Sequence, residues 1–145
     1  MEVPKIIIDT KVLLSALYSR RGASFKLISL VGQWYFDIVL SLPLFIEYKS
    51  IIKRNRSKIK LSDEKINDIL NYLCLVSEHH EIYYLWRPFL RDPKDDMILE
   101  LAVTARCKYI VTYNIRDFKG VEKFGIKVLS AKDFLNKIGV VKWAH

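Results

Sequence analysis

The sequence has few of the residues that build metal clusters or disulfide scaffolds. Its 145 residues include 2 cysteines, Cys74 and Cys107, and 3 histidines, His79, His80 and His145. The cysteines form no Cys-x-x-Cys or Cys/His group, and the histidines match no zinc-ligand spacing. This scarcity argues against a structural zinc site and is typical of a reduced intracellular protein with buried thiols.

Long hydrophobic runs are absent as well. No stretch approaches the roughly 20 apolar residues that a membrane-spanning helix requires. The start of the sequence, "MEVPKIIID", has an early acid and a very short apolar run, which differs from a signal peptide. We therefore expect a cytoplasmic protein without a membrane segment.

The chain is instead rich in apolar residues and in positive charge. Apolar side chains make up 51% of the residues, which argues against disorder, and 145 residues suffice for one domain over residues 1–145 with a real core. The 24 Lys+Arg residues outnumber the 16 Asp+Glu residues, for a net charge of +8. This excess favours a polyanionic partner such as nucleic acid, or an acidic protein, although a solvated basic surface would give the same count.

Short apolar runs alternate with helical patterns along the whole chain. Strands are predicted at residues 5–9, 36–41, 81–86, 108–113 and 127–131, the runs "KIIID", "FDIVLS", "EIYYLW", "KYIVTY" and "KVLSA". Four of the predicted helices begin at N-cap signals: Ser41 with Pro43, Ser62 before Asp63 and Glu64, Asp92 with Pro93, and Ser130 with Asp133. The alternation predicts a three-layer α/β/α domain with a central, mainly parallel sheet.

Carboxylates follow or precede several of these strands. Asp9 comes directly after three isoleucines, where an unpaired charge is costly to bury. The other candidates are Glu47 in the helix after the second strand, Asp92, Asp95 and Asp96 at the start of the helix before residues 108–113, and Asp117 after that strand. Parallel strands end at one edge of a sheet, so these acids are expected to converge there. Packed carboxylates repel one another, and a hard cation such as Mg²⁺ or Mn²⁺ relieves that repulsion.

Each acid except Asp9 also has a good structural explanation. Asp92 alone is better explained as an N-cap, and Asp95 and Asp96 as first-turn acids that complement the helix dipole. Glu47 fits a solvated helix face as well as a ligand position, and Asp117 fits the start of a turn. The set of acids, rather than any single member, carries the prediction of a metal site.

Four stretches resemble the PIN domain family, metal-dependent ribonucleases that include the toxins of VapBC-type toxin–antitoxin pairs. They are "IIIDTKVLLSAL", "SLPLFIEYKSII", "RDPKDDMILELAVTARCKYIVTYNIRDF" and "KVLSAKDFL". The third is the most specific, because an acid-rich helix start, "LELA", a strand ending in Thr, an Asn and an Asp-Phe pair follow one another. The resemblance covers nearly the whole chain. It implies a PIN-like fold, an RNA substrate, an antitoxin partner and a homodimer.

The resemblance also implies roles for individual residues. It assigns the catalytic acids to Asp9, Glu47, Asp95 and Asp117, the metal ligands to Asp9, Asp95 (or Asp96) and Asp117, and supporting roles to Thr10, Thr112 and Asn114. In such enzymes the acids hold one or two Mg²⁺ or Mn²⁺ ions. A metal-bound water attacks the RNA phosphate, and the metal stabilises the leaving oxyanion.

Lys11 departs from the family pattern, which has Asn after the Asp-Thr pair. Lysine brings a positive charge and no acceptor, whereas asparagine offers a neutral hydrogen-bonding group. Three interpretations follow: Lys11 bends outward onto RNA phosphate, pairs with Asp9 and competes with metal, or neutralises the acids in place of a cation. We favour weakened metal binding.

A basic run follows the helix that carries Glu47. Residues 53–60, "KRNRSKIK", contain Lys53, Arg54, Arg56, Lys58 and Lys60. Such a run attracts RNA through counterion release, and a solvated loop explains it about equally well. The aromatic residues at 34–36 and 83–86 are expected to make core or subunit contacts rather than to stack on bases.

Two functions compete on this basis. One is a Mg²⁺- or Mn²⁺-dependent endoribonuclease acting as a toxin, and the other, motivated by Lys11, is a weakened or inactive PIN module that binds RNA or a protein. A phosphoacceptor receiver domain is disfavoured because paired acids after the first strand are missing. The sequence also lacks the G-x-G-x-x-G of dinucleotide-binding folds, and Lys11 occupies the second acid position of an Asp-x-Asp phosphatase.

Replacing Lys11 with asparagine is expected to tighten Mn²⁺ binding, because the change removes a positive charge close to Asp9. Calorimetric titration of both proteins with Mn²⁺ measures the difference. Equal affinities would contradict the expectation.

Overall fold

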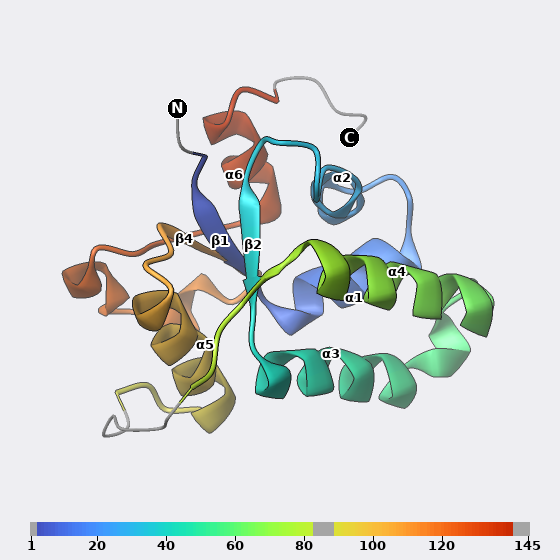
Figure 1. Cartoon of the computed structure of the whole chain (residues 1–145), viewed down its shortest axis with the longest axis horizontal. Helices are drawn as coiled ribbons and strands as arrows, with labels where there is room; N and C mark the ends of the chain where they lie inside the picture. The colour runs from blue at the N-terminus through green and yellow to red at the C-terminus, as the bar shows by residue number, and fades with distance from the viewer. Residues whose placement is uncertain (1–2, 83–88, 141–145) are drawn as a thin grey trace.

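Strands and helices alternate in the computed structural model, which describes residues 3–82 and 89–140 (Figure 1). The strands are β1 (Lys5–Ile8), β2 (Asp37–Leu40), β3 (Glu78–His79), β4 (Tyr109–Val111) and β5 (Lys127–Leu129). The α-helices are α1 (Thr10–Tyr18), α2 (Ala23–Ser29), α3 (Leu42–Arg54), α4 (Asp63–Val76), α5 (Pro93–Thr104) and α6 (Ala131–Lys137). Three short 3₁₀ helices are η1 (Arg56–Lys58), η2 (Ile115–Phe118) and η3 (Val121–Phe124).

The strands form one sheet of five in the order β3-β2-β1-β4-β5, and every pair is parallel. The three-layer α/β/α fold predicted from the sequence is confirmed. The predicted strand at residues 81–86 lies for the most part outside the described residues. The strand that pairs with β2 is β3, which is short and polar and therefore has no apolar pattern by which the sequence could reveal it.

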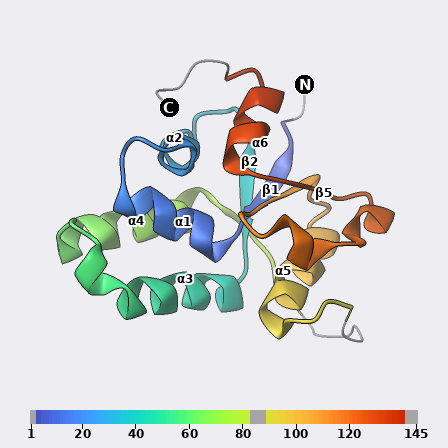
Figure 2. The same cartoon turned by 180° about the vertical axis from the view of Figure 1, so that it is seen from behind.

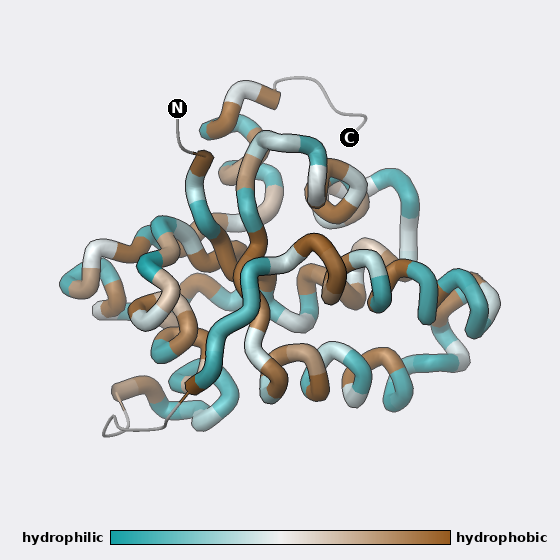
Figure 3. The backbone as a smooth tube through the Cα atoms, viewed as in Figure 1, coloured by the Kyte–Doolittle hydropathy of each residue, from teal (hydrophilic) through white to brown (hydrophobic). Residues whose placement is uncertain are grey.

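The core gathers around β1, whose three isoleucines (Ile6, Ile7 and Ile8) are fully buried. Helices α1, α2 and α6 pack together, while α5 contacts β1 and β2. Figure 2 shows α6 and β5 from behind, and Figure 3 shows hydrophobic residues concentrated in the strands and hydrophilic ones at the outer ends of α3 and α4. Both cysteines are free, and burial raises the pKa of the Cys107 thiol to about 12. That thiol is therefore a packing group rather than a nucleophile.

The predicted N-caps fix where the helices begin. Ser41 Oγ accepts a hydrogen bond from the Leu44 amide at 3.2 Å, and Asp92 Oδ1 accepts one from the Lys94 amide at 2.8 Å. Ser62 and Ser130 cap α4 and α6 in the same way. The caps of α3 and α5 matter most for function, because these two helices start near the carboxyl edge of the sheet.

The strand order creates a crevice beyond the carboxyl ends of β1 and β4. The chain leaves β1 toward β2 on one side, and β4 lies on the other side, so the connections diverge at this point. Open parallel sheets bind ligands at such switch points. Ile8 pairs with Val111 in the sheet, which places Asp9 and Thr112 next to each other at the mouth of the crevice.

The described helices include none that is long and apolar enough to cross a membrane.

Truncation of Leu99 in α5 is expected to destabilise the fold. Leu99 is fully buried, and Leu99→Ala should lower the free energy of unfolding by about 2–5 kcal/mol through lost burial and a cavity. Leu75→Ala is the matched control, because Leu75 is 81% exposed and its loss should change stability by less than about 0.5 kcal/mol. Urea denaturation measures both, and equal losses would contradict the description of the core.

Candidate active site

A cleft of about 500 Å³ opens at the carboxyl edge of the sheet, where the strand order predicts a ligand site. It lies between the start of α1, the helices α3 and α5, and the segment after β4. The predicted site residues that line it are Asp9, Thr10, Lys11, Glu47, Arg54, Asp95, Asn114 and Asp117, and Asp92 and Lys94 join them. Acids that are distant in the sequence therefore meet in one cleft.

Asp9 is held rigidly at the base of this cleft. It is the N-cap of α1 and only 8% exposed. Its Oδ1 accepts a hydrogen bond from the Thr10 amide at 2.8 Å, and its Oδ2 accepts one from Thr112 Oγ1 at 2.6 Å. Burial raises the pKa of Asp9, and the two hydrogen bonds and the nearby Lys11 charge oppose that rise. Thr10 and Thr112 thus both donate hydrogen bonds to the Asp9 carboxylate, and their supporting roles stay a prediction.

Asp95 shows most clearly that the carboxylates converge. Its pKa is raised to about 7, first by burial and then by the negative charges of Asp9, Asp92, Asp117 and Asp96. An isolated aspartate titrates near 4. The half-buried Asp95 carboxyl therefore shares its surroundings with other acids that no neighbouring cation fully neutralises.

Glu47 is already engaged by two basic side chains. Its Oε1 accepts a hydrogen bond from Arg54 Nη2 at 3.1 Å and one from Lys94 Nζ at 3.2 Å. Arg54 lies two turns further along α3, whereas Lys94 comes from the first turn of α5. The sequence analysis missed Lys94. The only signal for it is a lysine within the acid-rich helix start, "DPKDD".

Asp96 lies on the same helix start as Asp95 but serves the backbone. Its Oδ1 accepts hydrogen bonds from the amides of Phe89 at 3.1 Å and Leu90 at 2.7 Å, and Asp96 does not line the cleft. Asp92 both caps α5 and lines the cleft. Of the paired acids, Asp95 is therefore the one directed toward Asp9.

The segment after β4 supplies the remaining polar groups. Asp117 lies exposed in η2 and lines the cleft. Asn114 also lines it, and the Asn114 amide donates a hydrogen bond to Thr112 Oγ1 at 3.0 Å. Thr112 thereby connects this segment to Asp9.

Lys11 and Tyr48 flank the Asp9 carboxylate differently. Lys11 is exposed, and within the described residues it forms no ion pair with Asp9. Tyr48 is buried beneath the site, and its hydroxyl donates a hydrogen bond to the Ile8 carbonyl at 2.6 Å. Burial and the Asp9 charge both raise the pKa of Tyr48, so the phenol stays protonated and keeps that bond. The sequence analysis did not identify this role for Tyr48.

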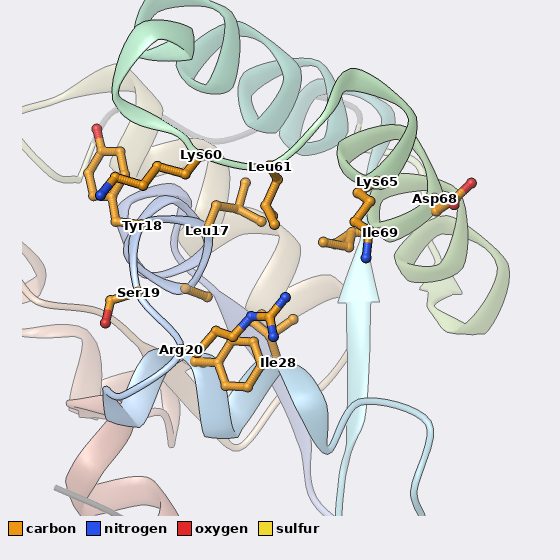
Figure 4. A pocket seen from close by; sticks show the side chains of 12 residues that line it. Leu17, Tyr18, Ser19, Arg20, Ile28, Lys60, Leu61, Lys65, Asp68 and Ile69 are labelled. Carbon is orange, nitrogen blue, oxygen red and sulfur yellow. The ribbon is translucent and has the colours of Figure 1, made fainter.

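The basic run divides between different surfaces. Arg54 lines the acid cleft, whereas Lys53 and Arg56 line a groove between α3 and α4. Arg56 is engaged in a 2.7 Å ion pair with Asp63 and in bonds to backbone carbonyls. Lys60 borders a separate pocket of about 600 Å³ formed by α1, α2 and α4 (Figure 4). Lys58 lies in η1 and is exposed.

The donor atoms suit a hard cation, although they are not gathered around one. All candidate ligands are carboxylate oxygens, with hydroxyl and amide oxygens beside them, which is the set that Mg²⁺ and Mn²⁺ prefer. Within residues 3–82 and 89–140, however, no three acidic, histidine or cysteine side chains form a preformed metal site. The chemistry of the site thus fits a divalent cation.

Comparison with known proteins identifies the family. A family model described as the PIN domain matches residues 5–116, well over half of the chain. The chain belongs to the PIN domain family. A search of curated proteins gives no match. The PIN domain has a nuclease-type fold, interacts with RNA and generally uses divalent metal ions.

Removing one of the charges around Asp95 is expected to lower its pKa. Asp117→Asn in this PIN domain eliminates one repulsive charge, so the Asp95 pKa should fall from about 7 toward the usual range. Carbon-13 NMR titration of the carboxyl groups without metal measures the change. Asp133→Asn, in α6, is the control and should leave the Asp95 titration unchanged; an unchanged Asp95 pKa in Asp117→Asn would refute the convergence of these acids.

Proposed function

We propose that this PIN domain is a metal-dependent endoribonuclease, folded as a single domain over residues 1–145, and the toxin component of a toxin–antitoxin pair. The observation that carries the proposal is the cleft at the carboxyl edge of the sheet, which Asp9, Asp92, Asp95 and Asp117 line together. Burial and the charges of the other acids raise the pKa of Asp95 there. Perturbed carboxylates in a cleft are typical of catalytic sites. Here the perturbation comes from burial and from like charge, which is the situation that a bound cation resolves.

Asp9, Asp95 and Asp117 are the residues that would hold Mg²⁺ or Mn²⁺. When bound, the cation would activate water for attack on an RNA phosphodiester and stabilise the charge that develops on it. Thr112 and Thr10 fix the orientation of the Asp9 carboxylate through their hydrogen bonds. Bonds to groups behind a metal ligand position that ligand and tune its basicity.

In this proposal Glu47 binds basic side chains and is not a free metal ligand. Because its Oε1 accepts bonds from both Arg54 and Lys94, it holds two positive groups at the rim of the cleft. Arginine and lysine in that position can bind a phosphate group of RNA beside the acids. The negative charge of Glu47 then offsets the repulsion between the two basic groups.

The partners proposed for this chain are an antitoxin and a second copy of the chain. Large apolar side chains are exposed on the surface, including Trp34 at 89%, Leu42 at 69% and Ile46 at 55%. Exposed apolar groups that lie near one another are typical of protein interfaces. Leu42 and Ile46 are one turn apart on α3, the helix that carries Glu47, so a protein bound there would also cover the rim of the cleft.

A catalytically weakened or inactive PIN module is the second candidate function. It is favoured by the engagement of Glu47 with two basic residues, by Lys11 in place of asparagine, and by the lack of a preformed metal site among the described acids. Such a protein would bind RNA or a partner without cleaving it.

Cleavage of a fluorescent single-stranded RNA distinguishes the two functions. The nuclease requires that wild-type protein cleaves with Mg²⁺ or Mn²⁺ and not with EDTA. Asp95→Asn should lower the rate at least about 100-fold, because the loss of a group behind a ligand alone costs about 10–100-fold. Asp133→Asn is the matched control and should retain full activity.

If the wild-type protein cleaves RNA with neither Mg²⁺ nor Mn²⁺, the proposed nuclease activity is wrong. Cleavage that appears only in Lys11→Asn would instead support the weakened PIN module. Full activity of Asp95→Asn would show that the acid cluster is not the site.

A further inference from the structure

A second hollow adjoins the acid cleft on its far side. It has a volume of about 570 Å³ and is formed by residues 89–92, the start of α5 and the segment 116–119. The two hollows share Asp92, Asp95 and Asp117 in their walls. These three acids therefore form a wall between the two hollows, which we call the acid divide, and do not lie at the closed end of a single pocket.

Positive side chains are present on both sides of this divide. The cleft contains Lys11, Arg54 and Lys94, and the second hollow contains Arg91, Arg116 and Lys119. Within the described part of the chain, Arg91, Arg116 and Lys119 take part in no ion pair. Basic groups without acidic partners in a concave surface are free to bind an anion.

The second hollow also offers an aromatic ring. Phe89 lines it and is 38% exposed. Phe124 contacts this ring edge-to-face, and Lys123 Nζ lies 4.4 Å from its centroid. Basic groups that follow a backbone, combined with aromatic rings that contact bases, characterise sites for single-stranded nucleic acid. An acidic peptide would use the charges but not the ring.

We propose that one RNA strand lies across the acid divide, with its backbone bound by Lys11, Arg54 and Lys94 on one side and by Arg91, Arg116 and Lys119 on the other. This inference rests on the proposed function, in that RNA is the ligand. The strand continues past the acids in both directions, so the bond presented to Asp95 is an internal one. Recognition of a strand end would instead require a site that is closed on one side.

This path differs from the one that the basic run suggests. Of the basic residues of that run, Arg54 alone lines either hollow, whereas the charges on the far side of the divide come from the region 91–119. The pocket in Figure 4 provides a comparison, because it also carries basic residues, Arg20, Lys60 and Lys65, on its border. That pocket has no group of acids like the one at the divide, so its basic residues are not expected to bind the strand.

The salt dependence of RNA binding tests the path. Binding of a short, labelled single-stranded RNA is measured by fluorescence anisotropy in EDTA at several salt concentrations, so that no cleavage occurs. The double variant Arg116→Gln/Lys119→Gln should reduce the slope of log affinity against log salt by about 1.4, since each phosphate contact to a single strand contributes about 0.7. Arg20→Gln/Lys65→Gln removes the same charges elsewhere and should retain the wild-type slope. Equal slopes for wild type and Arg116→Gln/Lys119→Gln, or an equal loss in both double variants, would overturn the path.

A circular RNA of the same sequence tests whether the strand continues in both directions. The proposal requires that circular and linear RNA bind with similar affinity, while binding that needs a free end would overturn it. Polyglutamate, used as a competitor, represents the alternative ligand, an acidic peptide. If polyglutamate displaces RNA when both are added at the same concentration of negative charge, the surface recognises acidic protein and the proposed RNA path is wrong. These measurements involve no cleavage. If the protein binds RNA as expected but does not cleave it, the proposed nuclease activity is wrong, while the proposed path of the RNA strand still holds.

Discussion

The buried Asp9 carboxylate, held by Thr112 and Thr10, is the interaction on which the site depends. Burying a charge is costly unless hydrogen bonds compensate, and the 2.6 Å bond from Thr112 provides much of that compensation. The bond is possible because β1 and β4 pair in parallel with Ile8 beside Val111. The sheet register therefore determines where Asp9 lies, and with it the start of α1, which Asp9 caps. Thr112 also accepts a hydrogen bond from the Asn114 amide, which connects Asp9 to the segment that carries Asp117.

The distribution of charge explains how a chain with a net charge of +8 can carry a cleft lined by acids. Carboxylates occupy the floor of the crevice, and basic residues border it. Glu47 connects the two zones by accepting bonds from Arg54 and Lys94. Groups of both charges therefore line the same cleft.

Local sequence signals predicted most of the fold, and four of the acids they singled out, Asp9, Glu47, Asp95 and Asp117, line one cleft. The three isoleucines before Asp9, the serine N-caps and the acid-rich start of α5 are short-range patterns, and the structure bears them out. What could not be predicted depends on residues distant in sequence. β3 is defined only by its pairing with β2, and Lys94 lies 47 positions from Glu47. The choice between Asp95 and Asp96 likewise depends on the amides of Phe89 and Leu90, which only the folded chain places near Asp96.

The proposed function requires that the acid cluster binds a divalent cation because its carboxylates repel one another. The most direct test is the melting temperature with and without Mg²⁺ at about pH 8 and about pH 5, at constant ionic strength. The Asp95 pKa is about 7, well above that of the unfolded chain, so ionisation of this carboxyl destabilises the metal-free fold progressively from about pH 4 to about pH 7, and the full cost persists above pH 7. Mg²⁺ should therefore raise the melting temperature clearly at about pH 8, where Asp95 is charged, and less at about pH 5, where Asp95 is protonated. No Mg²⁺ effect at about pH 8, or equal effects at both pH values, would contradict the account.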